Sequence, residues 1–160
     1  MTRERARRGR NPFETRRRAR RRALQALYQW QLNDDSAASI VKQFLEEQNF
    51  DDVDADYFRH LVHDVIARGT ALDDRLAPHI ERVDTSLDQM ERVILRIGAL
   101  ELFDHPEIPY RVVIDEAVDL APRFGLPPKF ALDAPSPYGE GVWQSGGVGF
   151  RWDAHIPMRN

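Results

Sequence analysis

Arginine clustering at the start of the chain is the feature of this sequence with the clearest chemical consequence. Eleven of the first 22 residues are arginine and only Glu4 and Glu14 oppose them, so this segment carries +9 in a chain of net charge −3. Guanidinium groups bind phosphate oxygens in pairs and stack on unpaired bases. Each phosphate that they neutralise also releases condensed counterions. The basic segment therefore predicts binding to a polyanion, with nucleic acid as the first candidate.

The second half of the cluster, residues 16–22, runs directly into an apolar stripe at helical spacing. After the helix breakers Asn11 and Pro12, the pattern predicts a helix over about 15–32 with Thr15 as its cap. Its first two turns would carry charge on every side, which no core accommodates. We therefore expect this end of the helix to project from a bundle, where arginines reach phosphates and bases. The expected RNA-binding side chains here are Arg16, Arg17, Arg18 and Arg20.

The basic segment has three other possible interpretations. It could be a solvated helix end without a ligand, an organellar transit peptide, or a basic helix on a membrane surface. No serine precedes Ser36, which disfavours a transit peptide, and the remainder of the chain is acidic, which an anionic membrane would repel. The arginines within residues 3–10 are expected to add only non-specific attraction.

The composition narrows the class of protein. At 160 residues the chain predicts one domain, and without cysteine it has neither disulfides nor thiolate metal sites. No apolar run is long enough for a membrane span and no secretory signal is evident, so the expected location is the cytoplasm. His60 and His63 lack a third ligand, which favours a solvated helix face over a metal site. Neither a glycine-rich phosphate loop nor a Gly-x-Ser-x-Gly nucleophile motif appears in the sequence.

Hydrophobic periodicity predicts an all-α fold. After the first helix we expect a second over about 37–48, a third from the acidic residues 51–54 to a break at Gly69, and a short fourth over 71–80. A fifth begins at a capping box formed by Ser86 and Gln89, and a sixth covers about 110–121. Residues 126–160 hold five of the ten prolines and five of the nine glycines. This tail is expected to be irregular, with at most one or two short strands.

Several blocks of this sequence follow one another in the order and spacing of a known family. They are residues 16–20, 25–32, 57–59, 90–97, 109–121 and the Phe124-Gly125 pair. Together they resemble the NusB family of transcription antitermination factors over about residues 15–125. On this basis we expect a disordered basic arm over 1–14, a helical RNA-binding domain over 15–125, and an irregular tail over 126–160 that departs from the family pattern.

The resemblance implies a fold and a function. The family is a helical bundle in two subdomains, which is non-enzymatic and uses no cofactor. Its members bind a short single-stranded RNA element, boxA, together with the ribosomal protein NusE. They then join other Nus factors on RNA polymerase, notably during ribosomal RNA synthesis. Because the family includes monomers and dimers, a homodimer stays open.

The resemblance also implies site residues. Lys129 and Phe130 are the remnant of a family motif that contacts RNA, and Tyr28, Glu91 and Arg96 match the surface that binds NusE. Each of the last three has an alternative role. Tyr28 could be a core residue, Glu91 could belong to an intrahelical ion pair, and Arg96 could form an internal salt bridge.

Two rival functions follow from the same residues. NusB-like domains also precede the catalytic domain of ribosomal RNA methyltransferases, but only 35 residues rich in proline and glycine follow residue 125 here. A structural or assembly protein with an incidental basic arm is the other rival, and binding to NusE and boxA RNA would distinguish it.

Overall fold

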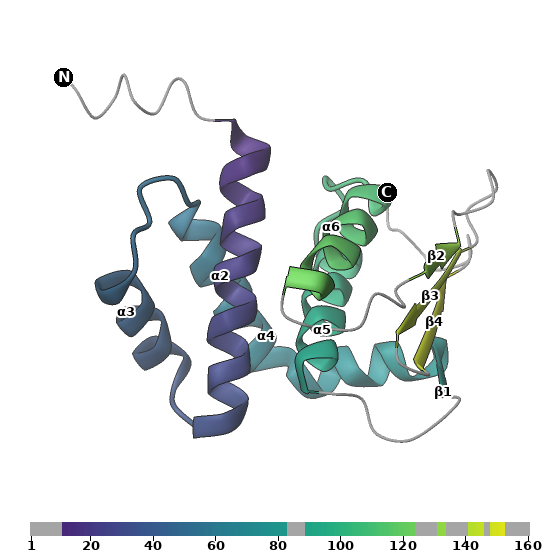
Figure 1. Cartoon of the computed structure of the whole chain (residues 1–160). Helices are drawn as coiled ribbons and strands as arrows, with labels where there is room; N and C mark the ends of the chain where they lie inside the picture. The colour runs from purple at the N-terminus through teal and green to yellow at the C-terminus, as the bar shows by residue number, and fades with distance from the viewer. Residues whose placement is uncertain (1–10, 83–88, 124–130, 134–140, 146–147, 153–160) are drawn as a thin grey trace. The chain divides into compact units, whose positions relative to one another are not determined.

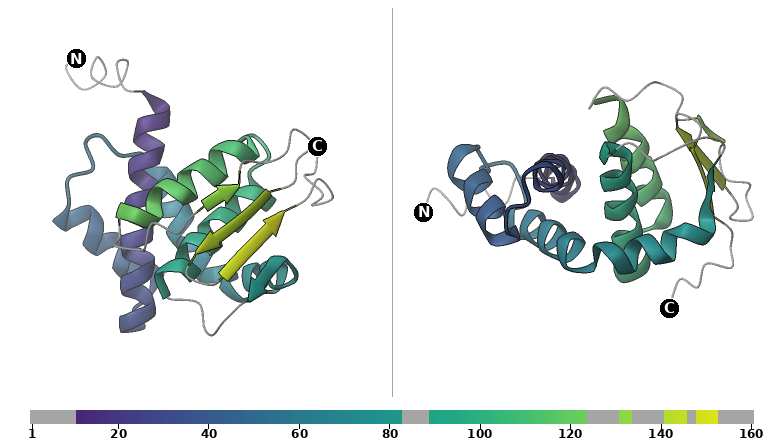
Figure 2. Two further views of the ribbon diagram at one scale, coloured as in Figure 1. Left: turned by 45° about the vertical axis from the view of Figure 1, so that its right-hand side comes forward. Right: turned by 90° about the horizontal axis from the view of Figure 1, so that it is seen from below.

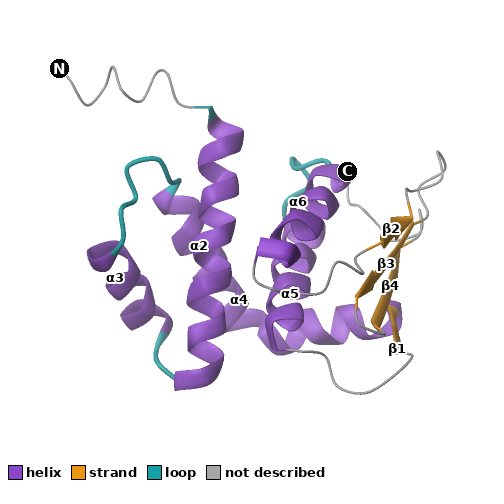
Figure 3. Ribbon diagram, viewed as in Figure 1, coloured by secondary structure: helices purple, strands orange, loops and turns teal. Residues whose placement is uncertain are grey.

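The computed structural model describes residues 11–82, 89–123, 131–133, 141–145 and 148–152, with side chains over 11–78 and 89–120. Within these residues the fold is dominated by five α-helices (Figures 1 and 3). The chain divides into two compact units, Met1–Ala67 and Arg68–Asn160, each of which is described by itself. The predicted all-α class is confirmed. None of the described helices is long and apolar enough to cross a membrane.

The first described helix, α2, extends over Pro12–Asn33 and begins earlier than predicted. The side chain of Asn11 accepts a hydrogen bond from the backbone N–H of Phe13 at 3.0 Å. Pro12 occupies a first-turn position, where a missing N–H costs nothing. The prediction that these two residues break the helix and that Thr15 caps it was therefore wrong, because the pair is a strong helix start.

Helices α3 (Ala37–Glu47) and α4 (Ala55–Leu76) complete the core of the first unit. Ser36 caps α3 by accepting from the N–H of Ser39, and Asp54 accepts from the N–H of Tyr57 at the start of α4. Apolar faces of the three helices meet in the interior, where they are buried. The buried residues of this unit include Ala23, Leu24, Leu27, Ile40, Val41, Phe44, Tyr57, Phe58, Leu61, Val62 and Val65.

Gly69 does not interrupt α4, so the predicted break there, with a separate helix over 71–80, was wrong. The residue is buried, and the guanidinium carbon of Arg96 lies 3.6 Å from the position that a Cβ would take. At that distance a Cβ would make ordinary van der Waals contact, so neither a turn nor close packing requires glycine at this position. Helix α4 ends at Leu76, and a 3-10 turn over Ala77–His79 follows.

The second unit contains α5 (Gln89–Asp104) and α6 (Tyr110–Arg123), which lie side by side (Figure 2). Their facing apolar side chains are buried, as the strong periodicity of this part of the sequence predicted. The buried set is Val93, Ile94, Leu95, Ile97, Ala99, Leu100, Val113, Ile114 and Leu120. Ser86 of the predicted capping box lies outside the described residues.

Four short strands form one antiparallel sheet in the order β1-β4-β3-β2. They are β1 (Ile80–Arg82), β2 (Ala131–Asp133), β3 (Gly141–Ser145) and β4 (Val148–Trp152). Three of them belong to the tail, one more than expected. Ser145 pairs with Val148, so only Gly146 and Gly147 separate β3 from β4. A Gly-Gly pair between two short runs is typical of a tight hairpin, and it is the sequence signal for the pairing of β3 with β4.

Candidate nucleic-acid interface

The arginine run occupies the second to fourth turns of α2, because the helix begins at Pro12. The side chains of Arg16, Arg17 and Arg18 are about two-fifths exposed, at 41%, 40% and 44%. Arg20 is only 4% exposed. The prediction that the whole run projects into solvent was therefore wrong for Arg20, since the earlier helix start carries this turn into the first unit.

The aromatic ring of Tyr57 is a neighbour of both Arg20 and Arg16. The guanidinium carbon of Arg20 lies 5.5 Å from the centre of the Tyr57 ring, and that of Arg16 lies 4.8 Å from the same ring. Cations placed over an aromatic face are attracted by its quadrupole. The long aliphatic stem of arginine also tolerates burial when its charged end has such a neighbour. Arg20 thus supports the fold, whereas Arg16 keeps part of its side chain in solvent.

Backbone and carboxylate groups of the segment over residues 49–54 contact the exposed arginines. Arg16 Nε lies 3.9 Å from the Asp54 carboxylate, and Arg18 Nη1 lies 3.8 Å from that of Asp52. Further along α2, Arg22 donates to the carbonyl oxygen of Asn49 at 3.4 Å. These contacts are long and partly exposed, so each contributes little to stability. They place the guanidinium groups of Arg16, Arg18 and Arg22 near this segment, whereas Arg17 lies near Glu14.

Phe13 is a further residue of this surface, and the sequence analysis did not identify it. Its exposed fraction is 74%, although the side chain is large and apolar. It precedes Arg16 and Arg17 by three and four residues, the spacing that places side chains on the same face of a helix. An aromatic residue at this spacing before an arginine run is the signal that could have revealed it.

The three residues expected at a protein interface have different environments. Tyr28 is half-buried on α2, and Glu91 on α5 is 6% exposed. Arg96, with 12% of its side chain exposed, forms two hydrogen bonds to Asp73, with Nε–Oδ1 at 2.8 Å and Nη2–Oδ2 at 2.6 Å. The structure therefore shows the internal salt bridge for Arg96. The interface roles of Tyr28 and Glu91 stay predictions.

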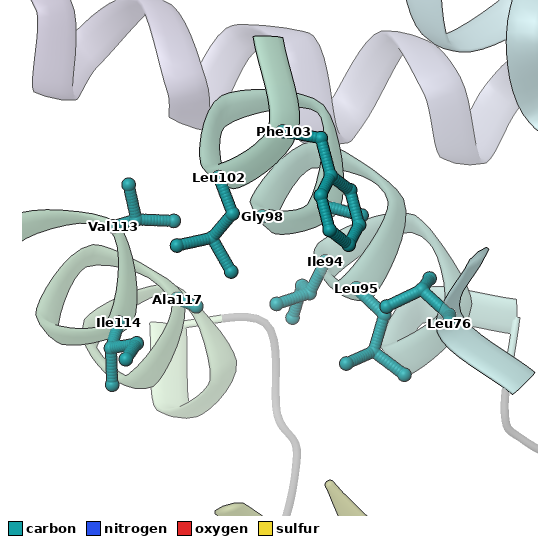
Figure 4. A pocket seen from close by; sticks show the side chains of 10 residues that line it. Leu76, Ile94, Leu95, Gly98, Leu102, Phe103, Val113, Ile114 and Ala117 are labelled. Carbon is teal, nitrogen blue, oxygen red and sulfur yellow. The ribbon is translucent and has the colours of Figure 1, made fainter. Parts of the chain in front are cut away.

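Lys129 and Phe130 lie outside the described residues, so their predicted contact with RNA stays a prediction. The second unit also contains an apolar hollow between α5, α6 and the end of α4 (Figure 4). Its lining consists of Leu76, Ile94, Leu95, Gly98, Ala99, Leu102, Phe103, Val113, Ile114 and Ala117. Because no lining side chain is ionisable, the hollow offers no group for acid–base or nucleophilic chemistry.

Comparison with known proteins places this arrangement in a family. Residues 17–131 match the model of the NusB family, which takes in most of the arginine run and all of the described helices after it. The chain belongs to the NusB family. The match continues to residue 131 and so extends beyond residue 125, the boundary expected from the sequence.

Relatives named transcription antitermination protein NusB support the assignment. The protein of Alcanivorax borkumensis is 47% identical over 115 residues, which are 72% of this chain and 77% of that protein. That of Xylella fastidiosa strain 9a5c is 44% identical over 108 residues, or 68% and 69% of the two chains. That of Hydrogenovibrio crunogenus is 47% identical over 106 residues, or 66% of each. The NusB family comprises non-enzymatic transcription antitermination factors.

Proposed function

We propose that this chain is a cytoplasmic transcription antitermination factor that binds boxA-like single-stranded RNA together with NusE. With other Nus factors, the complex would act on RNA polymerase during ribosomal RNA synthesis. The observation that carries the proposal is the row of half-exposed guanidinium groups on α2, formed by Arg16, Arg17 and Arg18. Membership of the NusB family supports it.

The distribution of these arginines around α2 favours a flexible strand over a rigid duplex. Consecutive helical residues differ by about 100° around the axis. The three side chains therefore span more than half of the circumference of the helix. A single strand can follow such a curved row of charges and leaves its bases unpaired for contact. A straight duplex would meet fewer of them at once.

Tyr28 in the first unit and Glu91 in the second are each proposed to contact NusE. A half-buried tyrosine combines a rigid apolar ring with a polar hydroxyl, a combination that is enriched at protein interfaces. Glu91 is 6% exposed, so a partner would have to approach closely to reach its carboxylate. A charged group at an interface selects a partner of opposite charge more than it adds affinity. We expect Glu91→Gln to weaken capture of NusE in a pull-down assay, with RNA affinity of the isolated chain unchanged.

The RNA surface is tested by replacing Arg16, Arg17 and Arg18 together with alanine. If about three phosphates are neutralised by these residues, the slope of log affinity against log salt falls in magnitude by about 2. The measurement is a titration of labelled boxA RNA by fluorescence anisotropy at several salt concentrations.

A matched variant controls for net charge. Replacing Lys42, Arg59 and Arg111 with alanine removes the same three charges from exposed positions on α3, α4 and α6. This control should lose less affinity and retain most of its salt slope. Equal losses in the two triple variants would mean that only overall charge matters, and the α2 surface would be rejected as the RNA site.

A further inference from the structure

Two large apolar side chains are exposed in the described part of the chain, and both are on α2. Phe13 lies in its first turn with 74% of its surface exposed, and Leu32 lies in its last turn with 56% exposed. A single exposed apolar side chain is ordinary on a protein surface. What distinguishes Phe13 from Leu32 is its surroundings, since arginines follow only Phe13 at helical spacing.

In the first unit, the segment over residues 49–54 contacts α2 at residues that follow Phe13 along the helix. The N–H of Asp54 donates to the carbonyl oxygen of Thr15, two residues after Phe13, at 3.1 Å. The turn before it is nevertheless ordered, since Asn11 caps it and Pro12 restricts its backbone. The aromatic ring is therefore presented from a backbone that is already fixed.

Arg16 and Arg17 flank this ring, three and four residues further along the helix. At this spacing Cβ atoms are about 5–6 Å apart. Arg16 is held by Tyr57 and Asp54, and Arg17 lies 3.3 Å from Glu14. A planar apolar ligand on Phe13 would therefore have a cation on each side. An unpaired base with its two flanking phosphates has this combination of a π face and negative charges.

We infer that Phe13 stacks on an unpaired base of the bound RNA, while Arg16 and Arg17 bind the adjacent phosphates. The inference rests on the proposed function and adds a base contact to a surface otherwise made of charges. Aromatic stacking tolerates any base, so Phe13 contributes affinity for single strands rather than sequence recognition. It also favours single strands over duplexes, in which bases are not available for stacking.

The test compares Phe13→Ala with Leu32→Ala, which removes the other exposed apolar side chain from the same helix. Binding is measured to single-stranded boxA RNA and to inorganic polyphosphate, which carries the charges without bases. Loss of a stacked base predicts an affinity for RNA lower by roughly 5- to 100-fold in Phe13→Ala. Affinity for polyphosphate and the salt slope should stay unchanged, Leu32→Ala should match the wild type, and Phe13→Tyr should retain RNA binding.

Several results would overturn the inference. Phe13→Ala could bind RNA as well as the wild type, or it could lose RNA and polyphosphate equally, which would indicate damage to the helix end. Full RNA binding by Phe13→Leu would show that an aromatic ring is not required, as when the residue contacts another protein or residues 1–10. If the wild type itself does not bind RNA, the proposed function fails and the inference fails with it. If the wild type binds RNA and Phe13→Ala binds it equally well, only the inference fails.

Discussion

Two arginine sites, one in each unit, use the same side chain for different purposes. On α2, Arg16 and Arg18 lie 3.8–3.9 Å from the carboxylates of Asp54 and Asp52, with about two-fifths of each side chain exposed. On α5, Arg96 forms two short hydrogen bonds to Asp73 and is 12% exposed. The first site keeps its guanidinium groups accessible to a ligand, whereas the second holds its guanidinium between α4 and α5.

The difference follows from geometry and solvent. Two short hydrogen bonds to one carboxylate satisfy a guanidinium and remove it from competition for phosphate. Long contacts between exposed charges are weak, and a phosphate can replace the carboxylate at little cost. The sequence around these arginines does not show which site is exposed, because the α2 arginines and Arg96 all lie on helices and all have acidic partners elsewhere in the chain. The exposed fraction of each side chain and the length of its contacts distinguish the two sites.

The largest expected effect is at Arg96 and Asp73. A double-mutant cycle with Arg96→Ala and Asp73→Ala should give a coupling energy of about 1.5–3 kcal/mol, as for charge-assisted hydrogen bonds. Urea unfolding of the four proteins measures it. RNA affinity of the folded Arg96→Ala variant should equal that of the wild type. A coupling below about 0.5 kcal/mol would place this pair in the same class as the α2 contacts.

A smaller effect is expected at Gly69, which neighbours Arg96. Because a Cβ there would lie 3.6 Å from the guanidinium carbon, Gly69→Ala meets only ordinary van der Waals contact. Alanine is the better helix former, so the free energy of unfolding should rise by about 0.5–1 kcal/mol. Thermal unfolding followed by circular dichroism checks this. A fall in stability instead would mean that Arg96 cannot accommodate even one methyl group.

The smallest effect on stability is expected at Arg18 and Asp52. The coupling energy from Arg18→Ala and Asp52→Ala should stay below about 0.5 kcal/mol, because both side chains are well exposed. Arg18→Ala should nevertheless weaken RNA binding, the reverse of the pattern at Arg96. Should Arg18→Ala destabilise the fold and leave RNA affinity intact, the contrast between the two sites would be reversed.

Much of the fold was predictable because apolar periodicity reports burial directly. The stripes of α3, α5 and α6 identified their helices to within a few residues. The errors occurred at residues with two possible roles. Asn11 and Pro12 break a helix interior but begin a helix well, and Gly69 ends many helices but here lies inside α4.

The sequence by itself determined the polyanion-binding character of the chain, its helical class and its resemblance to the NusB family, since charge, period and motif order are local properties. The tertiary structure alone decided which arginines remain accessible. It buried Arg20 against Tyr57, paired Arg96 with Asp73 and left Phe13 exposed beside Arg16. These outcomes depend on contacts between residues distant in sequence, and no local pattern encodes which of several similar side chains will meet a partner.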